Sequence, residues 1–132
     1  MSKISRNLQK VFRQKLINRD KRCLITSAPP IICEAAHIVE VKNHRKHPDI
    51  NIYHPSNGLL LRSDIHRLFD LNYWTIYPQD IIDSCKKTNQ TTFRIVLHPY
   101  VLDEDFYFKE LINKNIIVPT STIPYFFKRY EL

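Results

Sequence analysis

The middle of the chain has a strand–loop–strand–helix pattern, and this pattern restricts the fold more than any other feature. Residues 31–41 are apolar and β-branched, with a bend near Glu34, which predicts a strand. Residues 42–56 are polar and charged and predict a long loop. Residues 57–61 predict a second strand, and Ser63 has the character of a helix N-cap before an apolar helical face. Two strands followed by a helix bury their apolar residues by packing together.

Helical and extended patterns flank this region on both sides. Residues 4–18 place apolar groups on one helical face and basic groups on the other. The expected C-terminal elements are a hairpin of strands 74–77 and 93–97 connected by polar residues 78–92, helices at 103–111 and 123–131, and an extended segment at 116–118. No linker or repeat divides the chain. We therefore expect an α+β fold and a single domain over residues 1–132.

Cysteine usage and the lack of long apolar segments indicate a reducing compartment. The three cysteines, Cys23, Cys33 and Cys85, form no closely spaced pair, which argues for free thiols and against a structural zinc cluster. The N-terminal residues lack the apolar core of a signal peptide, and no apolar run is as long as a membrane span. The sequence therefore predicts a cytoplasmic protein with no membrane partner. Its only glycine, Gly58, needs a reason specific to that position.

The net charge of +7 is concentrated in the first half of the chain. Residues 1–66 carry 12 Lys and Arg against 5 Asp and Glu, whereas residues 67–132 carry 8 of each kind. A one-sided basic surface is typical of proteins that bind polyanions, because neutralising phosphates releases condensed counterions. A solvated face that only keeps the protein soluble gives the same charge pattern.

Three polar residues in the central pattern are suited to phosphodiester hydrolysis. His37 interrupts an apolar strand, Asn57 begins the next strand, and His66 lies early in the helix. A hairpin packed against this helix would bring the two histidines to one edge. Histidine is the side chain whose ordinary pKa suits a general base near neutral pH, and a cation would offset the charge that develops on the phosphate. Basic residues of the loop would contact phosphates beside the site: Lys42, Arg45 and Lys46.

The same residues resemble the motif of the HNH endonucleases. The resemblance runs through Glu-Ala-Ala-His-Ile at 34–38, Asn-Gly-Leu-Leu-Leu at 57–61 and Arg-Ser-Asp-Ile-His-Arg-Leu-Phe-Asp at 62–70. The His–Asn–His residues of the motif fall on His37, Asn57 and His66, with separations of 20 and 9 residues. The resemblance extends over roughly residues 12–130. It implies a ββα-metal (His-Me finger) core at about residues 31–72, with an N-terminal helix and a C-terminal hairpin and helix extension.

The resemblance also implies roles for these residues. His37 would be the general base, His66 a metal ligand, and Asn57 the residue that positions the loop bearing the base. The reaction would be endonucleolytic cleavage of DNA (RNA is not excluded) that leaves 5′-phosphate and 3′-hydroxyl ends. Mg²⁺ is the expected cofactor, and Mn²⁺, Ni²⁺ and Zn²⁺ also suit an imidazole ligand. A homodimer or a partner that gives specificity would fit a chain with no separate recognition domain.

One position departs from the family pattern. Many members carry an acidic or histidine metal ligand immediately before the base, where this chain has Ala36. Glu34 lies on the same face of the strand as Ala36, so we expect Glu34 or Asp70 to supplement His66 as a metal ligand. The remaining positions on the metal would be filled by water and phosphate oxygens. Arg62 and Arg67 flank this site in sequence, and next to the metal they would clamp the scissile phosphate.

Other interpretations of these residues remain open. His37 alone could be a histidine satisfied within the core, Asn57-Gly58 could be a turn or the start of a strand, and Arg62 and Arg67 could be surface charges. Two other functions also stay open. One is a catalytically weak or inactive nucleic-acid-binding module with the same fold, which Ala36 favours. The other is a subunit of a defence or toxin system that acts with a partner.

Overall fold

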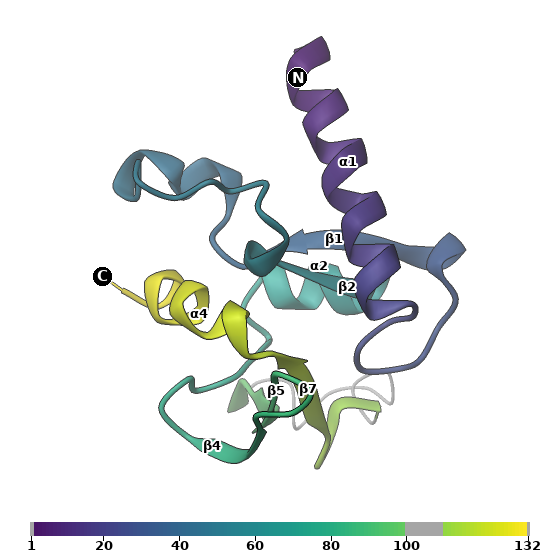
Figure 1. Ribbon diagram of the computed structural model, residues 1–132. Helices are drawn as coiled ribbons and strands as arrows, with labels where there is room; N and C mark the ends of the chain where they lie inside the picture. The colour runs from purple at the N-terminus through teal and green to yellow at the C-terminus, as the bar shows by residue number, and fades with distance from the viewer. Residues whose placement is uncertain (1, 100–109, 132) are drawn as a thin grey trace.

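The computed structural model describes residues 2–99 and 110–131 and combines helices with small antiparallel sheets, which confirms the α+β prediction (Figure 1). Its helices and strands, in chain order, are α1 (Lys3–Asp20), β1 (Cys33–His37), β2 (Gly58–Arg62), α2 (Ser63–Asp70), β3 (Trp74–Thr75), β4 (Ile81–Cys85), β5 (Gln90–Arg94), β6 (Val96–Leu97), β7 (Asn115–Pro119) and α4 (Ile123–Arg129). Short 3₁₀ turns lie at Pro30–Ile32, Val41–Lys46, Pro55–Asn57 and Thr120–Thr122.

Strands β1 and β2 form an antiparallel pair that lies between α1 and α2 (Figure 1). In the register of this pair, His37 is opposite Gly58 and Glu34 is opposite Leu61. Because side chains alternate along a strand, Glu34 and Ala36 point to one face and His37 to the other. Glu34 contacts α2, and Gly58 lies against α1, so the base candidate and the acidic residue face different helices.

Gly58 is required by the close approach of α1. A Cβ at this position would lie 2.5 Å from Phe12 Cζ and 2.7 Å from Leu16 Cδ1, both closer than carbon atoms tolerate. The backbone of Gly58 has φ −140°, which any residue can adopt, so sterics rather than conformational freedom explain the glycine. At the end of α1, Arg19 donates to the Gly58 carbonyl at 2.7 Å and Asp20 accepts from the Leu60 N–H at 3.0 Å. These contacts fix the helix on β2.

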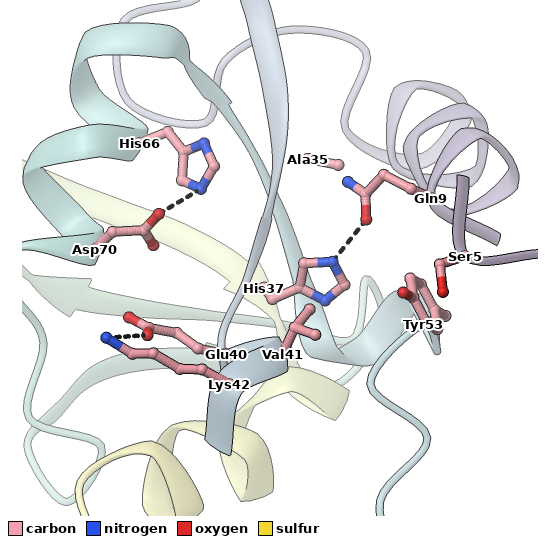
Figure 2. Close-up of a pocket in the computed structure, with 10 residues that line it drawn as sticks. All are labelled: Ser5, Gln9, Ala35, His37, Glu40, Val41, Lys42, Tyr53, His66 and Asp70. Atoms are coloured by element: carbon pink, nitrogen blue, oxygen red, sulfur yellow. Dashed lines mark hydrogen bonds and ion pairs between the residues drawn. The ribbon is translucent and has the colours of Figure 1, made fainter. Parts of the chain in front are cut away.

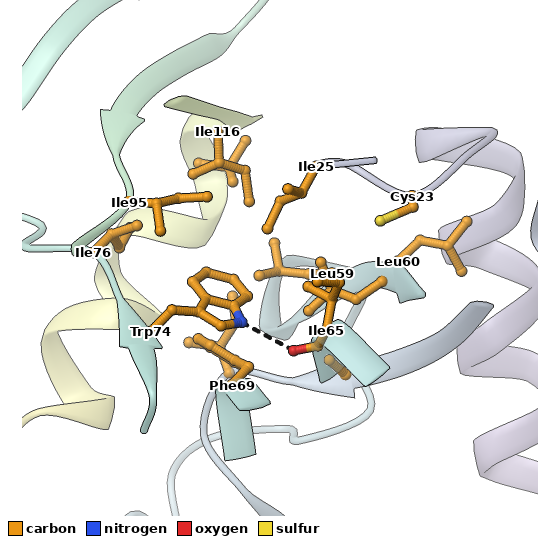
Figure 3. Close-up of a cluster of buried hydrophobic side chains, with 14 of the residues drawn as sticks. Cys23, Ile25, Leu59, Leu60, Ile65, Phe69, Trp74, Ile76, Ile95 and Ile116 are labelled. Atoms are coloured by element: carbon orange, nitrogen blue, oxygen red, sulfur yellow. Dashed lines mark hydrogen bonds between the residues drawn. The ribbon is translucent and has the colours of Figure 1, made fainter. Parts of the chain in front are cut away.

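One buried cluster connects the helices with both C-terminal sheets. Trp74 is fully buried against Phe69, and its indole N–H donates to the Ile65 carbonyl at 2.9 Å (Figure 3). Ile116 of β7 and Phe126 of α4 join the same cluster. Hydrophobic burial of this size is the main driving force for folding, and here it attaches α2 to the C-terminal part of the chain.

The predicted elements 31–41 and 57–61 exist with shifted boundaries. The first strand is only Cys33–His37, because residues 38–40 bend away and the chain then enters a 3₁₀ turn. Ser63 is the first residue of α2 rather than its cap, and its hydroxyl donates to the Ile32 carbonyl.

Two predictions for the C-terminal half are altered by the structure. The expected hairpin is present, since β3 pairs with β6. Its connection is not a simple polar loop, however. Strand β4 lies within residues 78–92, and β5 begins there and ends at Arg94. These two strands pair with each other, and β5 also pairs with β7. The helix expected at 103–111 falls almost entirely outside the described residues. Among the described helices, none has the length and apolar character needed to cross a bilayer.

Candidate active site

The buried side chain of Asn57 closes the loop between β1 and β2. Its Oδ1 accepts from the Val39 N–H at 2.8 Å, and its Nδ2 donates to the carbonyls of Val39 at 3.1 Å and Ile52 at 3.0 Å. The side chain is fully buried, so these bonds replace water that cannot reach it. Asn57 therefore connects the residues just after β1 to the end of the loop, and it also precedes the first residue of β2.

His37 is held by the same loop. Its Nδ1 lies 2.8 Å from the Ile52 carbonyl oxygen, the oxygen that Asn57 also contacts. The ring stacks on Phe12 with centroids 4.3 Å apart and meets Tyr53 edge to face. A carbonyl only accepts, so Nδ1 carries the proton and Nε2 of the neutral ring keeps its lone pair.

The environment of His37 favours this neutral form. Burial lowers the pKa of the His37 ring below its ordinary value, and the positive charge of His66 acts in the same direction. The hydrogen bond to Ile52 and the charge of Asp70 oppose this effect but do not outweigh it. His37 is therefore neutral, and able to accept a proton, at neutral pH.

His66 lies between two carboxylates. Its Nδ1 is 2.8 Å from Glu34 Oε1, and its Nε2 is 3.1 Å from Asp70 Oδ2, one helical turn later in α2. Burial alone would lower the pKa of His66, but the hydrogen bonds with Asp70 and Glu34 outweigh it and raise the pKa. Each carboxylate thus contacts a different nitrogen of the His66 ring, and both raise the pKa of this ring.

Both histidines line one pocket of about 580 Å³ (Figure 2). His66 and Asp70 form one wall, and Gln9 of α1 lies across from them beside His37. Since His37 points toward α1 while His66 comes from α2, the pocket spans the unpaired edge of β1. His66 and Asp70 also line a second, smaller hollow of about 370 Å³, together with Arg67.

The basic residues predicted in the loop differ in their relation to this pocket. Lys42 lines it, with its Nζ 3.1 Å from Glu40 Oε2. Arg45 and Lys46 are exposed at the end of the same 3₁₀ turn and are not among the residues that line the pocket. The loop therefore brings one lysine to the pocket and leaves two basic side chains beside it in solvent.

The two predicted arginines have different surroundings. Arg62 forms ion pairs with Asp64 and with Glu110, at 2.6 Å in both cases, and lines neither hollow near His66. The hydrogen bond from Arg62 lowers the pKa of Asp64, which keeps this pair charged. Arg67 is exposed and lines the smaller hollow together with His66, so it is the arginine nearer to the proposed metal ligand.

Arg129 of α4 was not found from the sequence, although it supports both sides of the pocket. Its guanidinium donates to the Ile38 carbonyl at 2.9 Å and to the Phe69 carbonyl at 2.7 Å. Ile38 directly follows the base candidate, and Phe69 directly precedes Asp70. The side chain is only 6% exposed and lies 3.8 Å above the Phe69 ring. No local pattern predicts such a contact, because its partners lie 91 and 60 residues away in sequence.

Gln9 of α1 was also missed. Its side-chain oxygen lies 2.8 Å from Nε2 of His37, the nitrogen that would accept a proton. A signal existed in the sequence, because Gln9 stands three and seven residues before Phe12 and Leu16, the two residues of α1 that are buried. Residues at these spacings share a helical face, so Gln9 points toward the same side as the apolar contacts.

The donor atoms beside His66 suit a cation that also binds ligands from outside the protein, such as water or phosphate oxygens. Among the described residues, no three His, Cys, Asp or Glu side chains are arranged to hold a metal ion together. Ala36, where the family pattern has a ligand, is fully buried and offers no donor atom. One imidazole nitrogen and one adjacent carboxylate remain, and this set fits a divalent cation that keeps several waters or phosphate oxygens as its other ligands.

A family model described as HNH endonuclease matches residues 23–77 of the chain. This segment contains β1, β2 and α2 with His37, Asn57 and His66. The match confirms the resemblance predicted from the sequence, while most of the chain, including α1 and α4, lies outside the matched residues. No curated protein and no solved structure shows significant similarity to the chain.

Proposed function

We propose that this protein is a metal-dependent endonuclease that hydrolyses DNA phosphodiester bonds with His37 as the general base. The observation that carries the proposal is the orientation of His37, whose Nδ1 is engaged by the Ile52 carbonyl while Nε2 faces a pocket shared with His66. The family match to residues 23–77 supports nuclease chemistry at this place. The antiparallel β1–β2 pair followed by α2 supports a ββα-metal core, with the whole chain acting as one domain.

In the proposed reaction, a water molecule loses a proton to Nε2 of His37 and attacks phosphorus. The Ile52 carbonyl keeps the other ring nitrogen protonated, and it can stabilise the imidazolium that forms. Asn57 holds this carbonyl in place through its own hydrogen bond. The phosphodiester bond to the 3′ oxygen breaks, and the products carry a 5′-phosphate and a 3′-hydroxyl.

The proposed cation site consists of His66 Nε2 and the Asp70 carboxylate. A divalent cation bound there would supply positive charge to the phosphate oxygens and to the departing 3′ oxygen. Glu34 contacts the other nitrogen of His66, which is the position from which a carboxylate orients a ligating imidazole. We therefore assign Asp70 as the second ligand and Glu34 as the orienting partner, with Mg²⁺ as the expected ion.

Titration calorimetry of metal into three proteins tests this division. Asp70→Asn should weaken binding the most, because it removes a charged oxygen next to His66 Nε2. Glu34→Gln should weaken it about 10-fold or more, as is typical when the partner of a ligating histidine is lost. Equal affinity in the two variants and the wild type would overturn both assignments.

The basic residues around the pocket support a polyanionic substrate. Lys42 at the pocket, Arg67 at the adjacent hollow, and Arg45 and Lys46 on the loop can contact phosphates on either side of the scissile bond. Arg62 stays a prediction as a phosphate clamp, and it would have to leave two carboxylates to serve as one. DNA is the proposed substrate because the family resemblance implies it.

Cleavage of supercoiled plasmid tests the proposal. Wild-type protein with Mg²⁺ should nick the plasmid, and EDTA should abolish the reaction. His37→Ala should lose cleavage but still bind DNA, because the basic residues remain. His98→Ala is the matched control, since His98 is exposed and not among the residues that line the pocket. Full activity of His37→Ala would refute the assignment of the base.

A second function is favoured by one specific observation. The described residues hold no three-ligand metal group, and Ala36 replaces the family's usual ligand. A nucleic-acid-binding module that does not cleave would have this property. It predicts DNA binding by the wild type with no plasmid nicking at any concentration of Mg²⁺, Mn²⁺, Ni²⁺ or Zn²⁺.

A further inference from the structure

The proton-accepting nitrogen of the proposed base is covered by a side chain from α1. Nε2 of His37 lies 2.8 Å from Oε1 of Gln9, which is a full hydrogen-bond distance (Figure 2). No water molecule fits between two atoms at this separation. As the structure stands, the base therefore contacts Gln9 and not the water that it would have to deprotonate.

The amide of Gln9 can form this contact with either protonation state of His37. An amide oxygen accepts from a protonated Nε2–H, which is the orientation of the described contact. Turning the amide over presents its NH₂ group, which donates to the lone pair of the neutral ring, and this is the orientation that suits the ring at neutral pH. The contact therefore persists through the protonation change that base catalysis requires, and only movement of the side chain removes it.

The contact can be displaced at low cost. In the described part of the chain, the Gln9 side chain makes no other hydrogen bond than the one to His37. It belongs to the N-terminal half of α1, which extends away from the body of the protein, where Ile4, Leu8 and Val11 are exposed (Figure 1). A rotation of one long, half-buried side chain is enough to uncover Nε2.

We propose that Gln9 is an inhibitory residue that occupies Nε2 of His37 in the resting protein and yields this position to the attacking water when a nucleic acid enters the pocket. This proposal rests on the proposed nuclease function and adds a residue outside the segment that matches the family model. It assigns to α1 a regulatory part, because the helix supplies the group that competes with water for the base.

The first test compares plasmid cleavage by Gln9→Ala and Gln14→Ala. Gln14 has the same side chain on the same helix, but it is exposed, pairs with Asn18 and does not line the pocket. Gln9→Ala should cleave about fivefold faster at limiting substrate, because one ordinary hydrogen bond no longer competes with water. Gln14→Ala should equal the wild type. An unchanged or slower rate for Gln9→Ala would overturn the proposal.

The second test follows the protonation of His37 by NMR in the metal-free protein. The titratable groups that surround this ring are His66 and Asp70 from α2, Glu40 and Lys42 after β1, and Tyr53 from the loop. Gln9→Glu places a carboxylate at hydrogen-bond distance from Nε2 and should raise the pKa of His37 by about one unit or more. Gln14→Glu should change it much less, and equal changes in the two variants would show that Gln9 does not contact the base.

The two tests separate the failure of this proposal from the failure of the proposed function. A wild-type protein that does not cleave refutes the nuclease function, and the competition with water falls with it. A wild-type protein that cleaves, together with a Gln9→Ala variant that is no faster, refutes only the role of Gln9. Melting temperatures equal to the wild type for the Gln9 and Gln14 variants would show that the rates do not reflect unfolding.

Discussion

Replacing Asn57 by alanine should cost both stability and catalysis, because its buried amide has no substitute. The change removes three hydrogen bonds, to the Val39 N–H, the Val39 carbonyl and the Ile52 carbonyl. Ile52 keeps a partner in His37, so two groups of Val39 are left buried and unpaired. Each such group costs about 2 kcal/mol, which predicts a loss of about 4 kcal/mol in the free energy of unfolding. This is a large part of the stability of a small domain.

Urea denaturation of Asn57→Ala measures this loss, and Asn51→Ala is the matched control. Asn51 lies in the same loop but is exposed and accepts a single hydrogen bond, so its replacement should cost less than about 1 kcal/mol. The carbonyl that orients His37 would also lose its support in Asn57→Ala, and cleavage should fall on the order of 100-fold, as small misplacements of catalytic groups do. A stability loss below about 1 kcal/mol for Asn57→Ala would refute the reasoning.

Three further predictions follow from the site and its supports. The rate of cleavage should fall as the pH drops through the pKa of His37. Because burial lowers this pKa, half of the maximal rate should be reached below pH 6.5. A half-maximal rate at a higher pH would contradict the described burial of His37. Gly58→Ala should destabilise the protein by about 1–3 kcal/mol in urea denaturation, because the new methyl group meets α1. An unchanged urea midpoint would mean that α1 can shift away from β2 without cost. Arg129→Met should lower the free energy of unfolding by about 3 kcal/mol, because two buried carbonyls lose a charged donor. Arg129→Lys should recover part of this loss. An unchanged free energy of unfolding in Arg129→Met would show that Arg129 does not bridge Ile38 and Phe69.

The sequence was most informative where the contacts are short in range. The ten residues from Asn57 to His66 run through one strand and one helical turn, so their pattern predicts both elements. The face of Glu34 followed from strand alternation, and its contact with His66 agrees with that expectation. What alternation could not tell is which carboxylate meets which nitrogen of His66, because that depends on side-chain rotamers.

Other parts of the fold left no readable pattern in the sequence. All five residues of β4 are exposed, so this strand lacks the alternation of buried and exposed residues by which strands are recognised. It exists because β5 pairs with it, and β5 is in turn fixed by β7, more than twenty residues later. Arg129 likewise acquires its role only when α4 packs beneath the ends of β1 and α2.

Because the amide of Asn57 fixes both ends of the loop, the length of the loop can change without a change in the geometry of the pocket. This amide ties Val39 to Ile52, so the chain between these residues leaves and returns at fixed points. Insertions or deletions at the exposed Pro48–Asp49 should therefore be tolerated, whereas a single residue added between Asn57 and His66 would turn the second imidazole away from the first. Engineering of new contacts to a substrate can thus begin in the loop without disturbing the reacting groups.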